Sequence, residues 1–291
     1  MTTGLAHAKI NLALAVGPMR PDGLHEIATI YQRLELADGL TFEPADHLAV
    51  EGFAEDTLVR RALLEVAGAA RTEPGWRVTI DKRIPVGAGL GGGSSDAATA
   101  IRLACRALAN PLADDCVHSI ARGLGADVPF FLLGGRALGI GKGDEIYPLP
   151  DVPKLSLVLV SPRNIHVPTP DAYRWLHAPE LASLTKAQAA RKLFEFCALC
   201  WSAQGAALSN DFEPAVFRHH PWLARIRRVL LQGGASEALL AGSGSAVFGI
   251  FPSPAKARRA VVGFPHDQTF VCETVSRARY ARTMKIASVV V

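Results

Sequence analysis

Apolar residues in the first half of the chain fall in runs and spacings that predict strands and helices in mixed order. The nearly uninterrupted apolar stretch 8–16 predicts a buried strand, whereas alternation along 76–85 predicts a strand with one exposed face. Helical spacing marks three segments, 56–70, 94–109 and 114–125. An Asp stands at the start of the first segment as a helix cap, and we expect the second helix to begin at Ser94 or Ser95.

The remaining pattern predicts an α+β protein with a joint in the middle. Three prolines crowd residues 147–156 and suit a linker or a crossover. The extended segments expected around this joint are 40–52 as strand, turn and strand, 135–149, 155–162, 235–251 as two strands around a Gly-rich turn, and 285–291. The helices expected after it are 185–201, 220–234, which two glycines close, and 253–264. Because strands and helices do not alternate regularly, the order favours α+β over a doubly wound parallel sheet.

Composition narrows the classes of partner. The 291 residues carry 31 basic and 27 acidic side chains, a net charge of +4, without a run of like charges. This weak excess suits a small anionic ligand and argues against nucleic acid or an anionic membrane as a partner. Apolar runs stay below the roughly 18 residues of a membrane span. We leave the oligomeric state open between a monomer and a homodimer.

Cysteine usage indicates a reducing compartment. The five cysteines are an odd set in a chain without a recognisable secretory leader, so we expect a cytoplasmic protein. Cys197 and Cys200 form a C-x-x-C, but they stand in an apolar helical run without a second pair of ligands. Packing in the core is therefore favoured over a metal or redox role.

Residues 85–96, PVGAGLGGGSSD, contain the G-x-G-x-x-G spacing of a dinucleotide-binding turn at Gly87, Gly89 and Gly92. A Rossmann strand must run straight into the first Gly, and Pro85 interrupts that approach. The acidic residues about 20 positions further on lie in a loop before another helix, where they cannot bind a ribose. A Walker A loop fails as well, because the Gly-Lys-Gly step at 141–143 lacks the required hydroxyl. A nicotinamide enzyme is thus disfavoured.

The same glycine loop still predicts an anion site. Closely spaced glycines let backbone N–H groups approach a ligand, and the following helix adds the positive end of its dipole. The hydroxyls of Ser94 and Ser95 could bind a phosphate oxygen or its Mg²⁺. A Gly-rich turn without a ligand is the simpler alternative, but the number of glycines followed by Ser-Ser and a helix makes it the weaker one.

Motifs along nearly the whole chain resemble one enzyme superfamily. The segment PxGAGLGGGSSDAA resembles the phosphate loop of the GHMP kinases, and the combination of motifs resembles the 4-diphosphocytidyl-2-C-methyl-D-erythritol kinases among them. The matching segments, in order, are AKINLAL at 8–14, RPDGLHEIATIYQRL at 20–34, IDKRIPVGAGLGGGSSDAA at 80–98, LGADVPFFLLGG at 124–135, VPTP at 167–170, NDFE at 210–213 and AGSGSAVFG at 241–249.

The resemblance implies a fold and a reaction. It implies an N-terminal α/β domain of the ribosomal-protein-S5-domain-2 type, residues 1–152, and a ferredoxin-like C-terminal domain, residues 153–291, with the active site in the cleft between them. It also implies transfer of the γ-phosphoryl group of ATP, with Mg²⁺, to the 2-hydroxyl of the cytidylyl substrate in the non-mevalonate route to isoprenoids. Asp127 would be the catalytic base and Lys9 its partner, since an ammonium keeps a nearby carboxylate ionised.

The other site residues follow from the same motifs. The residues that would bind ATP are Lys82, Pro85, Val86, Gly87, Ala88, Gly89, Leu90, Gly91, Gly92, Gly93, Ser94 and Ser95, with Ser95 also the candidate metal ligand. The residues that would bind the substrate are Asn11, Leu24, His25, Tyr31, Thr169, Tyr173, Gly242, Ser243 and Gly244. Independently of the resemblance, Lys9 stands in a strand that otherwise reads as buried, where an unpaired charge is costly.

One departure from the motifs keeps alternatives open. The related kinases usually carry an aromatic residue between Gly and His in DGxH, and this chain has Leu24. Replacing a stacked ring by an aliphatic side chain would cost about 1–3 kcal/mol of base stacking. A GHMP kinase with another alcohol acceptor is therefore the nearest rival. A catalytically silent nucleotide-binding regulator is a second rival, against which the retention of Lys9 and Asp127 argues.

Overall fold

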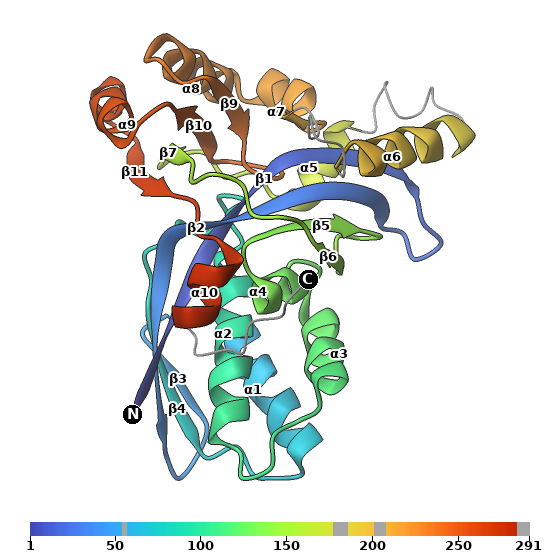
Figure 1. Ribbon diagram of the computed structural model, residues 1–291, viewed down its shortest axis with the longest axis vertical. Helices are drawn as coiled ribbons and strands as arrows, with labels where there is room; N and C mark the ends of the chain where they lie inside the picture. Colours follow the sequence, from blue (N-terminus) through green and yellow to red (C-terminus); the bar gives the residue numbers. More distant parts are fainter. Residues whose placement is uncertain (54–56, 177–185, 201–207, 284–291) are drawn as a thin grey trace.

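The computed structural model describes residues 1–53, 57–176, 186–200 and 208–283, which form two sheets with helices packed against them (Figure 1). The first sheet has seven strands within these residues, in the order β3-β4-β2-β1-β8, with the β5–β6 hairpin attached to β2. Its strands are β1 (Thr2–Met19), β2 (His25–Pro44), β3 (Ala49–Glu51), β4 (Trp76–Asp81), β5 (Arg136–Ile140), β6 (Glu145–Pro148) and β8 (Ser209–Asn210).

Four helices cover one face of the first sheet. They are α1 (Thr57–Ala70), α2 (Gly92–Ala107), α3 (Asp114–Leu124) and α4 (Val128–Leu133). The small and branched side chains of α1 and α2 pack on the inward residues of β2 and β4, such as Phe42 and Val78. The alternation that predicted β4 is observed, since Trp76, Val78 and Ile80 are buried and Thr79 and Asp81 are exposed.

The second sheet has the ferredoxin-like arrangement expected for the C-terminal half. Its strands are β7 (Ser156–Ser161), β9 (Glu237–Leu240), β10 (Val247–Phe251) and β11 (Gln268–Glu273), in the order β11-β7-β10-β9. The neighbouring strands of this sheet all pair in antiparallel orientation. Helices α8 (Pro221–Gln232) and α9 (Pro254–Ala260) pack on this sheet and complete the βαββαβ unit.

The two halves share a core. Leu157, Leu159 and Phe248 of the second sheet pack in one cluster with Ala8 and Ile10 of β1. In addition, the short strand β8 pairs with β1 in parallel although it comes from the second half of the chain. The middle of β1, the glycine loop and the turn after β9 are therefore packed together.

Most of the expected elements are present, and one helix start is wrong. Helix α2 begins at Gly92 with Gly91 as its cap, two residues before Ser94, because Gly91 adopts the left-handed conformation (φ 71°) from which the first turn can start. The amide of Ser95 already donates to the carbonyl of Gly91 (2.9 Å), so Ser95 lies inside the helix. The Asp expected to cap the first helix and the strand expected at 285–291 lie outside the described residues.

Some elements have no counterpart in the sequence prediction. These are α4, α5 (Thr169–Leu176), α7 (Glu213–His219), α10 (Arg277–Thr283), β8 and β11. The helix expected over 185–201 is observed as α6 (Lys186–Cys200). None of the helices in the described part of the chain combines the length and apolar character needed to cross a bilayer.

Candidate active site

A cleft of about 330 Å³ lies where the glycine loop, the start of α4 and the turn after β9 meet. Eleven of the residues singled out from the sequence line it: Lys9, Asn11, Tyr31, Gly89, Gly91, Ser94, Asp127, Thr169, Tyr173, Gly242 and Ser243. Leu14, Ile27, Ala126, Lys142 and Phe212 line it as well. The cleft therefore gathers residues from both halves of the chain.

A charge pair stands in the wall of this cleft. The ammonium of Lys9 lies 3.3 Å from Asp127 Oδ2 and donates to Asn11 Oδ1 at 2.9 Å. The side chain of Lys9 is only 6% exposed, whereas that of Asp127 is 31% exposed and faces the cleft. A buried ammonium is expensive unless it is paired, so this contact offsets the burial of Lys9 and holds the carboxylate of Asp127 at the cleft surface.

The local structure of β1 and β2 fixes Lys9. Lys9 and Asn11 are two residues apart on one strand and therefore project from the same face. The amide of Asn11 donates to Thr29 Oγ1 (2.7 Å), whose hydroxyl in turn donates to the carbonyl of Ala13 (2.8 Å). This chain of hydrogen bonds orients Asn11 Oδ1 toward the ammonium. The backbone amide of Lys9 also donates to the carbonyl of Leu90, which ties β1 to the glycine loop.

Tyr31 is the third group at the carboxylate. Its hydroxyl donates to Asp127 Oδ1 (2.9 Å) and lies 3.2 Å from the carbonyl of Gly143. Burial raises the pKa of Tyr31 well above its ordinary value, and the charge of Asp127 raises it further. The phenol therefore stays protonated and serves as a fixed hydrogen-bond donor to Asp127.

The glycine loop has the backbone geometry of an anion cradle. Gly87, Gly89 and Gly91 all have positive φ, between 68° and 79°. A Cβ on Gly89 would lie 2.0 Å from the carbonyl oxygen of Ala241, so the close packing of the loop on the turn after β9 requires glycine there. The first amides of α2, at Gly92, Gly93 and Ser94, fall outside the i to i−4 ladder and can donate to a ligand.

The two serines after the loop have different positions. Ser94 lines the cleft. Ser95 is fully buried, and its hydroxyl lacks a hydrogen-bond partner within the described residues. A buried hydroxyl without a partner is uncommon and points to a ligand or water that completes its bonding.

Lys82 lies beside the helix start rather than in the cleft wall. Its ammonium bonds to Asp38 Oδ2 (2.7 Å) and to Asp96 Oδ2 (2.5 Å), and it stands 3.1 Å from the position of a Cβ on Gly92. Burial lowers the pKa of Lys82, but the carboxylates of Asp96 and Asp38 outweigh burial, so that the pKa is raised overall. The lysine is thus a fixed positive charge next to the first turn of α2.

Thr169 and Tyr173 of α5 also line the cleft, whereas His25 lies against Tyr173 without lining the cleft itself. The rings of His25 and Tyr173 stack with centroids 5.3 Å apart and planes 19° apart, and His25 Nδ1 lies 2.9 Å from the carbonyl of Gly17. The hydroxyls of Thr169 and Ser243 are 2.9 Å apart. Burial, with a further contribution from Asp127, raises the pKa of Tyr173 to about 12. His25 itself is 7% exposed.

The NDFE segment supports the turn after β9. Asn210 donates to the carbonyls of Leu240 (2.9 Å) and Gly242 (2.7 Å), and Glu213 accepts the amide of Leu240 (2.8 Å). Burial raises the pKa of Glu213, against the effect of that amide and of Arg227. These bonds hold Gly242 and Ser243 at the cleft, which explains why a motif remote from the glycine loop belongs to the same site.

Several singled-out residues are not part of the cleft lining. Among them, Leu24 is half-exposed next to His25, and Gly244 packs on Leu240 and Val167. Conversely, Lys142 is a cleft residue that the sequence motifs do not identify, because its Gly-Lys-Gly step matches a Walker loop only in part. The available signal is its Gly-Lys-Gly step within the expected extended segment 135–149, since glycines there indicate a turn, and turns present their side chains at sheet ends.

The described residues do not gather three or more His, Cys, Asp or Glu side chains that could hold a metal ion. Cys197 is partly buried among apolar side chains near β1, as expected for packing. The described structure says nothing of the Cys200 side chain, so that half of the C-x-x-C stays untested.

Comparison with known proteins identifies the class. The model of the GHMP kinases N-terminal domain matches residues 57–135, and that of the GHMP kinases C-terminal domain matches 188–265. A mevalonate kinase from Methanococcus jannaschii shares the fold, with a TM-score of 0.68 over 94% of this chain and 98% of its own, at 14% identity. The fold and the site thus define a GHMP kinase.

Relatives with higher sequence identity show which family of GHMP kinases the chain belongs to. A 4-diphosphocytidyl-2-C-methyl-D-erythritol kinase from Solibacter usitatus is 47% identical, with 96% of this chain and 92% of the relative covered. A crystal structure of 4-(cytidine 5'-diphospho)-2C-methyl-D-erythritol kinase superposes with a TM-score of 0.76 at 35% identity, over 94% of this chain and 99% of the other. The chain belongs to the 4-diphosphocytidyl-2-C-methyl-D-erythritol kinase family.

Proposed function

We propose that this enzyme transfers the γ-phosphoryl group of ATP to the 2-hydroxyl of 4-diphosphocytidyl-2-C-methyl-D-erythritol, a step of the non-mevalonate isoprenoid pathway. The observation that carries the proposal is the Lys9–Asp127 pair, which stands in one cleft with the glycine loop and with Tyr173, on which His25 stacks. The family relationship supports this substrate over mevalonate or homoserine. We further propose a cytoplasmic enzyme divided at about residue 152.

Asp127 is the proposed catalytic base. As the substrate oxygen bonds to the γ-phosphorus, its proton passes to the Asp127 carboxylate, and the bond from the γ-phosphorus to the β,γ-bridging oxygen breaks to release ADP. The Tyr31 hydroxyl holds one carboxylate oxygen, and the Lys9 ammonium stabilises the other. Fixed donors of this kind need little rearrangement during the reaction, which is the main contribution of a protein to phosphoryl transfer.

The glycine loop and the first amides of α2 are the proposed seat of the nucleotide phosphates. Lys82 adds positive charge beside this turn, although Asp38 and Asp96 already engage its ammonium. The residues also fit a magnesium ion, because Mg²⁺ keeps waters and phosphate oxygens and needs only one or two protein oxygens. We assign Ser95 as that protein ligand on the basis of its buried hydroxyl without a partner among the described residues. When bound, the ion neutralises charge on the phosphate oxygens.

The cytidylyl substrate is proposed to bind at the α5 end of the cleft. His25 and Tyr173 offer a hydrogen-bonding edge and a ring face for the base, while Leu24 adds aliphatic contact. Lys142 lines the same cleft as Asp127, is 32% exposed and forms a long ion pair with Asp144 Oδ2 (3.6 Å), so its ammonium can also reach the diphosphate of the substrate. The proposed contacts to the methylerythritol part come from Asn11, Thr169 and the turn at Gly242.

A substrate panel tests the proposed function. Purified enzyme with ATP and Mg²⁺ is assayed for ADP formation with the cytidylyl substrate, mevalonate, homoserine and galactose. We expect turnover of the cytidylyl compound alone. Equal or preferred turnover of another alcohol would overturn the assignment, and product formation with a nicotinamide cofactor in place of ATP would overturn the reaction class.

A further inference from the structure

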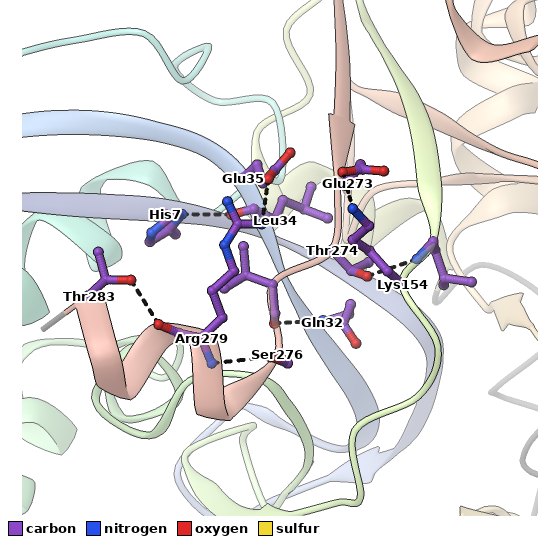
Figure 2. Close-up of polar contacts among 12 residues, drawn as sticks. His7, Gln32, Leu34, Glu35, Lys154, Glu273, Thr274, Ser276, Arg279 and Thr283 are labelled. Carbon is purple, nitrogen blue, oxygen red and sulfur yellow. Dashed lines mark hydrogen bonds and ion pairs between the residues drawn. The ribbon is translucent and has the colours of Figure 1, made fainter. Parts of the chain in front are cut away.

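The last described helix, α10, lies beside α4 (Figure 1). The segment between β11 and α10 is hydrogen-bonded to β2 and to residues 154–155, which lead into β7. Arg279 bonds to Glu35 (2.5 Å), as Figure 2 shows. Gln32 donates to the carbonyl of Val275 (3.3 Å), and the amide of Leu155 donates to Thr274 (3.0 Å). Helix α10 is therefore fixed to the N-terminal sheet although it ends the described chain.

One side chain of α10 reaches the catalytic segment. The hydroxyl of Tyr280, which is 2% exposed, donates to the carbonyl of Phe131 in α4 (3.0 Å). The same carbonyl accepts a bond from the guanidinium of Arg33 (2.7 Å). Because Asp127 is the residue that caps the start of α4, these bonds set the position of the short helix that follows the proposed base.

Arg33 is held in place by Tyr280 rather than by an acid. It is 1% exposed, and its guanidinium carbon lies 3.7 Å from the centre of the Tyr280 ring. Within the described residues Arg33 makes no ion pair with a carboxylate, and its Nε has no hydrogen-bond partner. Burial lowers the pKa of Arg33. Such a charge is costly to bury, and contacts with the ring face and a helix-end carbonyl offset part of that cost.

The segment after α4 is shaped to receive α10. Gly134 and Gly135 both have positive φ (78° and 67°). A Cβ on Gly134 would lie 2.3 Å from the Tyr280 ring, and one on Gly135 would lie 2.7 Å from the amide nitrogen of Arg277. The two glycines thus let the backbone after α4 pass directly against α10.

A second side chain of α10 holds the hairpin that carries Lys142. The guanidinium of Arg277 donates to the carbonyls of Arg136 (2.7 Å) and Leu149 (3.1 Å), at the open end of the β5–β6 hairpin. The turn at the other end of this hairpin places Lys142 in the cleft and the Gly143 carbonyl beside Tyr31. Arg277 thus connects α10 to a second wall of the cleft.

We propose that α10 is a positioning element of the active site, in which Tyr280 fixes α4 behind Asp127 and Arg277 fixes the hairpin that presents Lys142. This inference rests on the proposed function for the roles of Asp127 and Lys142. It concerns residues that do not touch the substrate and act only through the two elements that they hold.

The test compares Tyr280→Phe and Arg277→Met with Arg282→Ala, an exposed position in the last turn of the same helix. In the full-length protein at saturating ATP and cytidylyl substrate, we expect kcat to fall about 5-fold for Tyr280→Phe and about 10-fold for Arg277→Met, since small misplacements of reacting groups slow the chemical step. The KM for ATP should stay within about 2-fold of wild type. Arg282→Ala should behave as wild type.

A double-mutant cycle separates positioning from a general loss of folded enzyme. If Tyr280 acts through Asp127, Tyr280→Phe should change the residual single-turnover rate of Asp127→Asn by less than about 2-fold. Amide hydrogen exchange of peptides covering 125–133 should become faster in Tyr280→Phe, and that of 137–147 in Arg277→Met, whichever alcohol is the substrate.

Unchanged kcat together with unchanged exchange in both α10 variants would overturn the inference. So would an equal effect of Tyr280→Phe with and without Asp127. Either result leaves the proposed function intact as long as wild-type enzyme turns over the cytidylyl substrate, whereas a wild-type enzyme without such turnover contradicts the proposed function and leaves the exchange measurements to decide on α10.

Discussion

The ammonium of Lys9 lies 3.3 Å from the carboxylate of Asp127, and the Asn11 side chain holds that ammonium from the other side at 2.9 Å. Lys9 comes from the first strand and Asp127 from the turn before α4, so the contact forms only when the sheet and the helical layer are both in place. This contact turns a buried lysine, which would otherwise destabilise the fold, into part of a reactive site.

Replacing Lys9 with Met should reduce kcat by about 100-fold or more, because the carboxylate of Asp127 loses the ammonium that orients it and balances its charge. Binding of ATP, measured by calorimetry, should weaken less than about 5-fold, since the phosphate amides are untouched. Lys256→Met is the matched control, because Lys256 is an exposed lysine on α9. A Lys9→Met enzyme with wild-type kcat would remove Lys9 from the mechanism.

Replacing Gly89 with Ala should disrupt the glycine loop. The residue has φ 79°, and the new methyl group would meet the carbonyl oxygen of Ala241 at 2.0 Å, a backbone atom that cannot rotate away. We expect the free energy of unfolding to fall by about 2 kcal/mol or more and ATP affinity to fall at least about 10-fold. Chemical denaturation and calorimetry measure the two effects.

Gly68→Ala is the control for that experiment. Gly68 lies within α1, where an added Cβ would meet no atom within 4 Å. The change should raise the free energy of unfolding by about 0.5–1 kcal/mol, as alanine does in a helix, and leave ATP binding unchanged. Similar losses in the Gly68 and Gly89 variants would contradict the argument from backbone geometry.

Replacing Leu24 with Tyr should tighten binding of the cytidylyl substrate. Leu24 is 50% exposed beside His25, and a ring at this place could stack on a base that an aliphatic side chain only touches. A gain of about 1 kcal/mol, or roughly 5-fold in KM for the cytidylyl substrate, is expected. The KM for ATP serves as the internal control. A higher KM for the cytidylyl substrate would show that residue 24 does not face the base.

The stability of the protein should fall as the pH drops below about 6.5 because of His7. Burial, aided by the charges of Arg33 and Arg279, lowers the pKa of His7 from 6.5 to about 4. Between these values the unfolded chain binds a proton that the folded chain does not, so the free energy of unfolding decreases with decreasing pH, by up to about 3 kcal/mol at full effect.

The variant His7→Asn isolates that contribution. An Asn side-chain amide can replace the imidazole N–H that bonds to the carbonyl of Leu34 (2.8 Å), and it does not titrate. Urea unfolding at about pH 7 and about pH 4.5 should show a smaller loss in His7→Asn than in wild type. Equal losses in the two proteins would assign the acid sensitivity to other groups.

How much the sequence predicts depends on whether a feature is local. The apolar run of β1, the alternation of β4 and the glycine loop are local patterns, and each is observed in the structure. Helix α2 starts earlier than its side chains suggest, because Gly91 serves as a cap through its backbone conformation, without a capping side chain. In a sequence, glycine usually indicates the end of a helix, so no side chain marks the start of α2.

The sequence does not predict side-chain contacts that depend on tertiary structure. The contacts of Lys82 with Asp38 and Asp96 arise because β2 and β4 pair in a given register and α2 packs across them. The place of Lys142 in the cleft depends on how the β5–β6 hairpin is held, and α10, which holds it, was not predicted at all. The motifs identify Lys9 and Asp127, but the bonds of the Tyr31 hydroxyl to Asp127 and Gly143 exist only in the assembled site.

The most direct test of the central claim is the single-turnover rate of Asp127→Asn with ATP, Mg²⁺ and the cytidylyl substrate. The amide keeps the size of the carboxylate but cannot accept the proton of the attacking hydroxyl. We predict a rate at least about 100-fold below that of wild type, with ATP affinity within about 3-fold of wild type. A rate within about 3-fold of wild type would contradict the assignment of Asp127 as the base.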